Sequence, residues 1–211
     1  KGLSMHSSMI IGTAGFTAAE CVQKLERSGM TPASGPVLVT GATGGVGSVA
    51  VKLLAQLGYE VAAVTGKEDK HDFLRSLGAS EILSREEANA GSDKPMLAER
   101  WGGVVDTVGG DILFNGVKSL RYGCSLAACG LVAAPVFSAS VLPFILRHVN
   151  LLGIDSVQLP IEEKAEIWHR LGDEWLMDLS DLEEVLTLDD LSGAIDRILS
   201  GQMVGRGVVH L

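Results

Sequence analysis

The chain has 211 residues, 46% of them hydrophobic and 20% charged, so it can form a real core, and disordered or fibrous proteins are excluded. Seventeen lysines and arginines against 26 aspartates and glutamates give a net charge of −9, which argues against nucleic acid or an anionic membrane surface as a partner. No apolar run reaches the roughly 18 residues of a membrane span, and residues 1–12 lack a secretory signal, so we expect a cytoplasmic protein.

Short apolar or β-branched runs alternate with longer amphipathic stretches between residues 37 and 154, and glycine, proline or aspartate marks each junction. This alternation is typical of βαβ units with right-handed crossovers. The sequence therefore predicts an α/β fold with a doubly wound parallel sheet (a Rossmann fold) of six strands with helices on both faces. The expected strands are Val37–Thr40, Val61–Thr65, Glu81–Leu83, Gly103–Val108, Leu126–Leu131 and Leu151–Ile154, and the expected helices between them include Val46–Leu57, Asp69–Leu77 and Ile112–Leu120.

The two ends of the chain do not follow this alternation. Ser7–Leu25 predicts a helix that glycines interrupt, with no strand before it. Near the other end, Ile161–Leu171 and Asp189–Leu199 predict helices, and Gly207–Leu211 predicts a last strand. A last strand needs a neighbour, because unpaired backbone amides are costly when buried and adhesive when exposed. We therefore expect one domain over residues 1–211, with 1–30 as a leading helical segment and 159–211 as C-terminal helices and a strand that pairs outside the chain.

A glycine-rich turn joins the first strand to its helix. It reads Thr-Gly-Ala-Thr-Gly-Gly-Val-Gly over residues 40–47. Glycine permits a tight turn and a close approach of a diphosphate, while the amides and dipole of the helix N-terminus favour negative charge. We interpret the turn as a dinucleotide-binding site; the alternative is a βα turn that binds nothing.

The end of the second strand indicates which dinucleotide binds. An acidic residue there would hydrogen-bond a ribose 2′-hydroxyl, but the chain has Thr65, Gly66 and Lys67. A hydroxyl, a free amide and an ammonium suit a 2′-phosphate, and Arg85 can add a second cation. These residues favour NADP over NAD; the alternative is that Lys67 and Arg85 are ordinary surface cations.

Other chemistries have weaker support. The five histidines are dispersed without metal-ligand spacing, so no metal site is predicted. Cys21, Cys124 and Cys129 are expected to be free thiols. The turn matches neither a hydrolase elbow nor a P-loop. Small residues at 106–109 and 129–131 end later strands, where they can contact a nicotinamide or only pack.

Several of these segments together resemble one family. Residues 11–18, 41–47, 65–67, 106–109, 128–131, 143–147 and 153–157 look like the acryloyl-CoA reductase branch (also called YhdH-type quinone oxidoreductases) of the zinc-free medium-chain dehydrogenases/reductases. The resemblance implies an enzyme that uses NADPH to reduce the carbon–carbon double bond of acryloyl-CoA. It places the diphosphate on Gly44, Gly45, Val46 and Gly47, the 2′-phosphate on Thr65, Gly66, Lys67 and Arg85, and the nicotinamide beside Leu131, Ile145 and Ser156.

The chain departs from this family in three ways. The family more often has Ser and Arg where Thr65 and Lys67 stand, and an Asn near the final turn is replaced by Gly201. No Cys or His lies near residues 9–12, where zinc-dependent relatives place a ligand, so zinc is not expected. The family's N-terminal GroES-like catalytic domain has no counterpart here, so we expect this chain alone to be inactive. No residue is a convincing proton donor, and the catalytic residues stay unknown.

Two other functions remain open, and one partner is expected. The chain could belong to a quinone or enone reductase with the same half-site, or it could be a stand-alone NADPH-binding module without enzymatic activity. Related reductases pair the edge strand across a two-fold axis, so a homodimer through Leu151–Ile154 is expected. The alternative is that the helix Ile161–Leu171 covers that edge.

Overall fold

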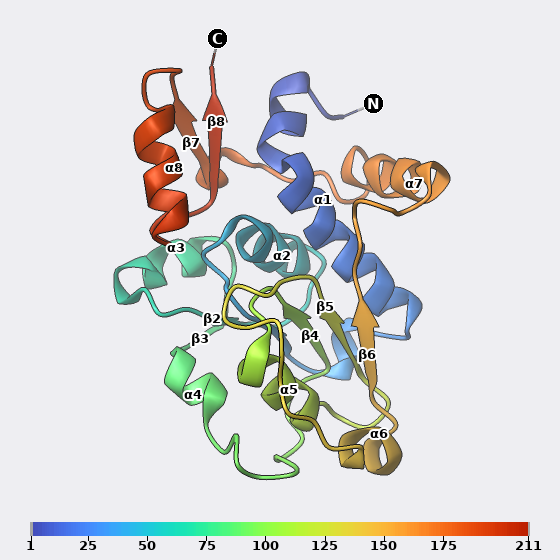
Figure 1. The fold of residues 1–211 in the computed structure, drawn as a ribbon. Coiled ribbons are helices and arrows are strands. Elements are labelled where there is room, and N and C mark those ends of the chain that lie inside the picture. Colours follow the sequence, from blue (N-terminus) through green and yellow to red (C-terminus); the bar gives the residue numbers. More distant parts are fainter. Residues whose placement is uncertain (1, 211) are drawn as a thin grey trace.

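A computed structural model describes residues 2–210 of the chain. Its centre is a parallel sheet of six strands in the order β3-β2-β1-β4-β5-β6 (Figure 1). The strand order reverses between β1 and β4, which creates the switch point where such sheets bind ligands. The predicted doubly wound parallel sheet is confirmed. The strands are β1 (Val37–Val39), β2 (Val61–Val64), β3 (Glu81–Leu83), β4 (Gly103–Asp106), β5 (Ser125–Ala128) and β6 (Asn150–Gly153).

Helices cover both faces of this sheet, so its strands are apolar on both sides. Val37 and Val39 belong to the core that α1, α2 and α3 share, whereas Leu38 belongs to the opposite core, with Leu113 and Phe114 of α5. Alternate side chains of one strand therefore fill two cores. The helices around the sheet are α1 (Met5–Arg27), α2 (Gly45–Gln56), α3 (His71–Ser76), α4 (Arg85–Asn89), α5 (Gly110–Lys118) and α6 (Leu142–Arg147).

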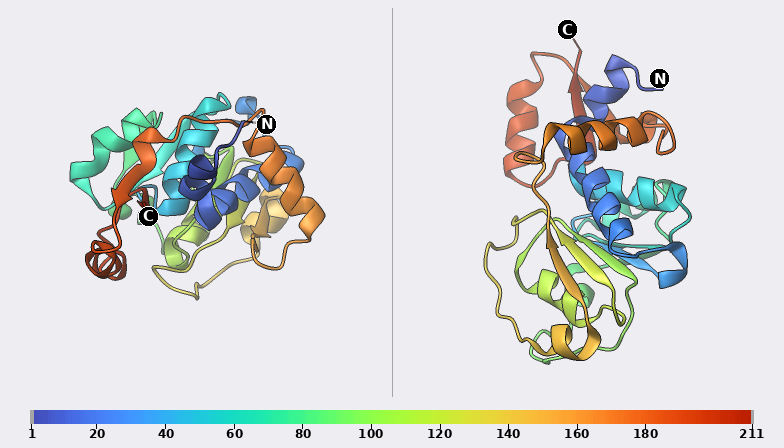
Figure 2. Two further views of the ribbon diagram at one scale, coloured as in Figure 1. Left: turned by 90° about the horizontal axis from the view of Figure 1, so that it is seen from above. Right: turned by 90° about the vertical axis from the view of Figure 1, so that its right-hand side faces the viewer.

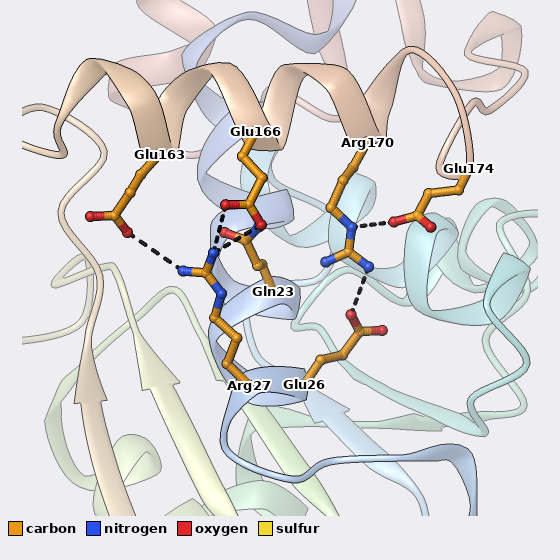
Figure 3. Close-up of polar contacts among 7 residues, drawn as sticks. All are labelled: Gln23, Glu26, Arg27, Glu163, Glu166, Arg170 and Glu174. Atoms are coloured by element: carbon orange, nitrogen blue, oxygen red, sulfur yellow. Dashed lines mark hydrogen bonds and ion pairs between the residues drawn. The ribbon is translucent and has the colours of Figure 1, made fainter.

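Helix α7 (Ile161–Leu171) lies across α1 and is tied to it by ion pairs (Figure 3). Arg27 of α1 pairs with Glu166 at 2.8 Å, and Arg170 of α7 pairs with Glu26 of α1 at 2.9 Å. The guanidinium of Arg170 also stacks on Trp175, 3.5 Å from the ring centroid. Since α7 packs on α1, its contacts do not cover the edge strand β6, which stays largely exposed.

A small C-terminal unit stands above the carboxyl ends of the strands, beside the start of α1 (Figure 2). It consists of β7 (Glu183–Leu186), α8 (Leu191–Leu199) and β8 (Arg206–Val209), and its two strands pair in parallel. The last strand thus has one neighbour within the chain, β7, and its pairing with a further strand outside the chain stays a prediction. Strand β7 was not predicted, because its two glutamates obscure the apolar pattern of a strand. The last expected strand residue, Leu211, lies outside the described residues.

Helix α1 has the predicted interruption. Gly12 has a φ of +48°, and the helix resumes after this kink. No helix among the described residues is long and apolar enough to cross a membrane.

Candidate functional site

The glycine turn leaves the N-terminus of α2 open. Gly44 occupies the N-cap position and has no side chain to satisfy the first amides of the helix. A Cβ on Gly47 would lie 2.3 Å from the carbonyl oxygen of Gly41, so only glycine lets the helix start this close to the turn. The free amides and the helix dipole therefore offer a place for an anionic group.

A buried polar network orders the ends of β1 and β4 beside this turn. The hydroxyl of Thr40 donates to Oδ1 of Asp106 at 2.7 Å, and the amide of Gly109 donates to Oδ2 at 2.8 Å. The amide of Thr107 donates to the Thr40 hydroxyl, while the Thr107 hydroxyl donates to the Thr40 carbonyl. Burial raises the pKa of Asp106, and the hydrogen bonds from Thr40 and Gly109 oppose that rise. This network fixes both sides of the switch point.

A cavity of about 170 Å³ opens between these strand ends and α4. It is too small for a whole dinucleotide but has room for part of one, since pockets for drug-sized ligands exceed about 300 Å³. Its lining contains one charged side chain, Arg85, and no carboxylate. The lining residues are Thr40, Gly41, Thr43, Val64, Thr65, Gly66, Arg85, Val108, Ile112, Val132 and Ala133.

Two cations meet at the end of β2, as the sequence predicted, but their arrangement differs in detail. Arg85 lies against Gly66, where a Cβ would come within 2.8 Å of its Nε, and it makes no side-chain hydrogen bond or ion pair among residues 2–210. Lys67 donates its ammonium to the carbonyl of Met203 at 2.9 Å. Burial lowers the pKa of Lys67; the nearby carboxylate of Asp69 opposes this, and the cations Lys70 and Arg85 lower the pKa further. An anion bound here would relieve that repulsion.

The backbone amide of Lys67 already has a partner within this site. It donates to Oγ1 of Thr65 at 3.1 Å, which closes a local turn. The Thr65 hydroxyl keeps its own proton as a donor. Among the described residues, the donors that remain are therefore the Gly66 amide, this hydroxyl, the Lys67 ammonium and the Arg85 guanidinium.

Arg206 was missed by the sequence analysis, and the structure brings it to the glycine turn. Its Nε donates to the carbonyl of Ile10 at 2.9 Å, and a Cβ on Gly45 would lie 2.8 Å from its Nη1. No carboxylate pairs with it among the described residues, and burial lowers its pKa. The amide of Gly205 donates to the carbonyl of Thr43, which fixes this segment beside the turn. A guanidinium with no carboxylate partner in residues 2–210 thus stands beside the N-terminus of α2.

The three residues expected beside the nicotinamide do not come together. Leu131 follows β5 and Ser156 follows β6, so both lie beyond the carboxyl ends of their strands. Ser156 accepts a hydrogen bond from the Thr17 hydroxyl at 3.0 Å. Ile145 lies on α6, which precedes β6 and therefore sits at the amino end of the sheet, away from the glycine turn. Ile145 is 70% exposed there.

The histidines are less dispersed than their sequence positions suggest. His6 on α1, Glu183 on β7 and His210 after β8 meet, with their ligand atoms within 4.8 Å of one another. His210 follows the last residue of β8, whereas Glu183 begins β7 and is the register partner of Arg206. No spacing in the sequence could reveal this group, because its members come from three distant segments.

Comparison with known proteins identifies relatives of the whole chain. The family described as zinc-binding dehydrogenase matches residues 45–173. Acrylyl-CoA reductase AcuI of Ruegeria pomeroyi is 50% identical over all of this chain. The yhdH oxidoreductase of Salmonella enterica, in its crystal structure in complex with NADP, is 45% identical to this chain, with a TM-score of 0.93. The match covers 100% of this chain and 64% of the Salmonella chain. The Bacillus subtilis protein yhfP with NAD bound is 44% identical, with a TM-score of 0.96, over 100% of this chain and 65% of its own.

The chain spans 64% of the length of the Ruegeria relative. The matched part contains the six-stranded sheet, the glycine turn and the C-terminal unit described above.

Proposed function

The chain belongs to the zinc-binding dehydrogenase family, and from that premise we propose that it is the NADPH-binding part of a reductase that acts on the carbon–carbon double bond of an enoyl thioester. The observation that best supports this proposal is that Lys67 and Arg85 lie near each other at the end of β2. No carboxylate lines the cavity at this place. An acidic residue at this place would repel a 2′-phosphate, whereas two cations attract it. NADP in the crystal structure of the Salmonella relative supports this choice.

Three groups of residues contact three parts of the cofactor. In the turn Gly44–Gly47, the amide of Gly44 already donates to the Gly41 carbonyl at 3.0 Å, so the open amides that follow it and the guanidinium of Arg206 hold the diphosphate. Thr65, Gly66, Lys67 and Arg85 hold the 2′-phosphate, and the cavity between them takes the adenosine. Leu131 and Ser156, beyond the ends of β5 and β6, face the nicotinamide. Ile145 is left out of this site because α6 lies at the other end of the sheet.

When bound, the cofactor supplies a hydride for the conjugated acceptor. The residues of this chain bind and orient it, and the walls of the crevice reduce its contact with water. We propose acryloyl-CoA as the acceptor, on the ground of the 50% identity to the Ruegeria acrylyl-CoA reductase. The part of the longer relatives that this chain does not span would complete the acceptor pocket.

Zinc has no role in this proposal, although the family description names it. A zinc ion in proteins takes Cys, His, Asp or Glu ligands, and none of these lines the cavity. The residues beside the glycine turn therefore do not fit a metal, and no step depends on one.

A quinone reductase is the second candidate. The Bacillus relative YhfP carries the name of a quinone oxidoreductase, and its structure contains NAD. Steady-state rates separate the two: NADPH oxidation is measured with acryloyl-CoA and with a small quinone, in a protein that joins this chain to the N-terminal part of its relatives. A higher kcat/KM with the quinone than with acryloyl-CoA would overturn the thioester assignment. NADPH binding without turnover of either would favour a non-enzymatic binding module.

We also propose a homodimer through the edge of β6. Leu151 on this strand is 36% exposed, and Leu146 and Ile145 on the preceding helix α6 are exposed beside it. An open sheet edge with apolar neighbours is commonly paired. Sedimentation should give twice the chain mass, and Leu151→Lys should give the monomer mass; a wild-type monomer at tens of micromolar would contradict the dimer. Three free cysteines and an NADPH-dependent reductase are consistent with the cytoplasm as its location.

A further inference from the structure

His6, Glu183 and His210 form a cluster that the cofactor site does not use. The two carboxylate oxygens of Glu183 each face a different imidazole: Oε2 lies 3.0 Å from Nε2 of His6, and Oε1 lies 3.3 Å from Nε2 of His210. The two rings are close to perpendicular, with centroids 5.1 Å apart. Three elements that are distant in sequence thus bring two imidazole nitrogens and a carboxylate together, with one ligand atom of each residue within 4.8 Å of the others.

The distances between these donor atoms suit a small divalent ion. Metal–ligand distances of about 2.0–2.2 Å for imidazole and carboxylate place the donors of a tetrahedral ion roughly 3.4 Å apart. The observed separations of 3.0 and 3.3 Å on Glu183, and the limit of 4.8 Å over the whole group, are compatible with this after small side-chain rotations. No backbone movement is needed.

Exposure of the cluster is uneven in a way that suits a metal with water ligands. The Glu183 side chain is 13% exposed, so packing holds the carboxylate in place between the histidines. The side chains of His6 and His210 are 46% and 50% exposed. An ion bound here can therefore complete its coordination with water from the open side.

We propose that His6, Glu183 and His210 bind a divalent ion of the zinc type. Two imidazole nitrogens and one carboxylate favour a borderline transition metal over Mg²⁺ or Ca²⁺, which prefer oxygen ligands. The ion would join the first turn of α1 to both strands of the C-terminal unit. Its role is structural: it fastens the segment that carries Arg206 at the opposite end of β8.

The test is calorimetric titration of the chain with ZnCl₂ after removal of metals. One Zn²⁺ should bind per chain, and His6→Ala, His210→Ala and Glu183→Gln should each weaken that site at least about tenfold. His169→Ala removes an exposed histidine on α7 and should leave it unchanged. MgCl₂ at the same concentrations should give no saturable heat.

Two further readouts keep the test independent of folding defects. Co²⁺ should give visible absorption bands of a low-symmetry site in the wild type that His6→Ala abolishes. At about a hundredfold excess of Zn²⁺ over its Kd, the thermal midpoint of the wild type should rise by about 5 °C or more, whereas Glu183→Gln should show little rise. No saturable Zn²⁺ binding, or binding that these three variants leave unchanged, would overturn the proposal.

Discussion

The hydroxyl of Thr40 donates to the buried carboxylate of Asp106 at 2.7 Å, where β1 and β4 end side by side. These strands flank the point where the sheet changes direction, so this hydrogen bond joins the two halves of the nucleotide-binding edge. The glycine turn begins immediately after Thr40, and Asp106 also holds the amide of Gly109. These hydrogen bonds therefore fix the position from which the glycine turn begins.

Asp106→Asn should lower the free energy of unfolding at pH 7 by about 1–3 kcal/mol, because either the Thr40 hydroxyl or the Gly109 amide loses its acceptor. Urea denaturation measures the change. Asp111→Asn, at an exposed position in the first turn of α5, is the control and should change it by under about 0.5 kcal/mol. Equal effects of the two substitutions would contradict the role given to Asp106.

The free energy of unfolding should depend on pH differently in the wild type and in Asp106→Asn. Burial raises the folded-state pKa of Asp106 above its ordinary 3.8, so the folded state holds the proton more tightly than the unfolded state. This contribution to stability is fully present below pH 3.8 and is lost as the pH rises through the raised pKa. The stability of the wild type relative to Asp106→Asn should therefore fall with increasing pH in that window. A constant difference would mean that the carboxyl does not titrate there.

Lys67→Ala should weaken NADPH binding by about 1.5–3 kcal/mol and NADH binding little, because a charge-assisted hydrogen bond to the 2′-phosphate is lost. Fluorescence titration with both cofactors measures this. Lys70→Ala is a matched control, since its ammonium pairs with Asp69 at 2.9 Å. Equal losses for the two cofactors would refute the assignment of Lys67 to the 2′-phosphate.

Arg206→Ala should weaken NADPH and NADH by similar factors, because both cofactors contain the diphosphate that the guanidinium faces. The expected loss is about 1.5–3 kcal/mol for each. Arg206→Lys keeps the charge but loses the fork geometry and should restore part of the affinity. Because Arg206 also donates to Ile10, the thermal midpoint of each variant is recorded. A loss confined to NADPH would place Arg206 at the 2′-phosphate instead.

The two arginines of the contact between α1 and α7 should differ in their contribution to stability (Figure 3). Arg170, 24% exposed, contacts Glu26, Glu174 and the ring of Trp175, so Arg170→Ala should cost about 1.5–3 kcal/mol. Arg27 is 50% exposed, and Arg27→Ala should cost about 0–1 kcal/mol. Denaturant melts of both variants give the comparison. A larger loss for Arg27 would show that exposure does not govern these pairs.

The sheet and the glycine turn could be predicted because their signals are local. Each strand is a short apolar run, and Gly44, Gly45 and Gly47 lie next to one another in the chain. Strand ends shifted by a few residues: β4 stops at Asp106 rather than Val108, because Asp106 accepts the hydrogen bonds that end the strand. The two-residue period of a strand and the 3.6-residue period of a helix are visible within such short segments of sequence.

Contacts between distant segments could not be predicted in the same way. Arg206 lies almost 200 residues from Ile10, which accepts its hydrogen bond, and Glu183 reaches both His6 and His210. Ile145 belongs to α6, a helix that was not predicted and that ends just before β6, at the amino end of the sheet.

The position of residues 203–206 has a consequence for synthesis on the ribosome. Met203 accepts from Lys67, Gly205 donates to Thr43, and Arg206 lies against Gly45. A nascent chain can form all six strands of the sheet once residue 153 has left the exit tunnel, yet it lacks these contacts until some fifty later residues follow. The dinucleotide can therefore make its full set of contacts only after translation of this segment, and the earlier intermediate relies on the backbone ladders of the sheet and on core packing.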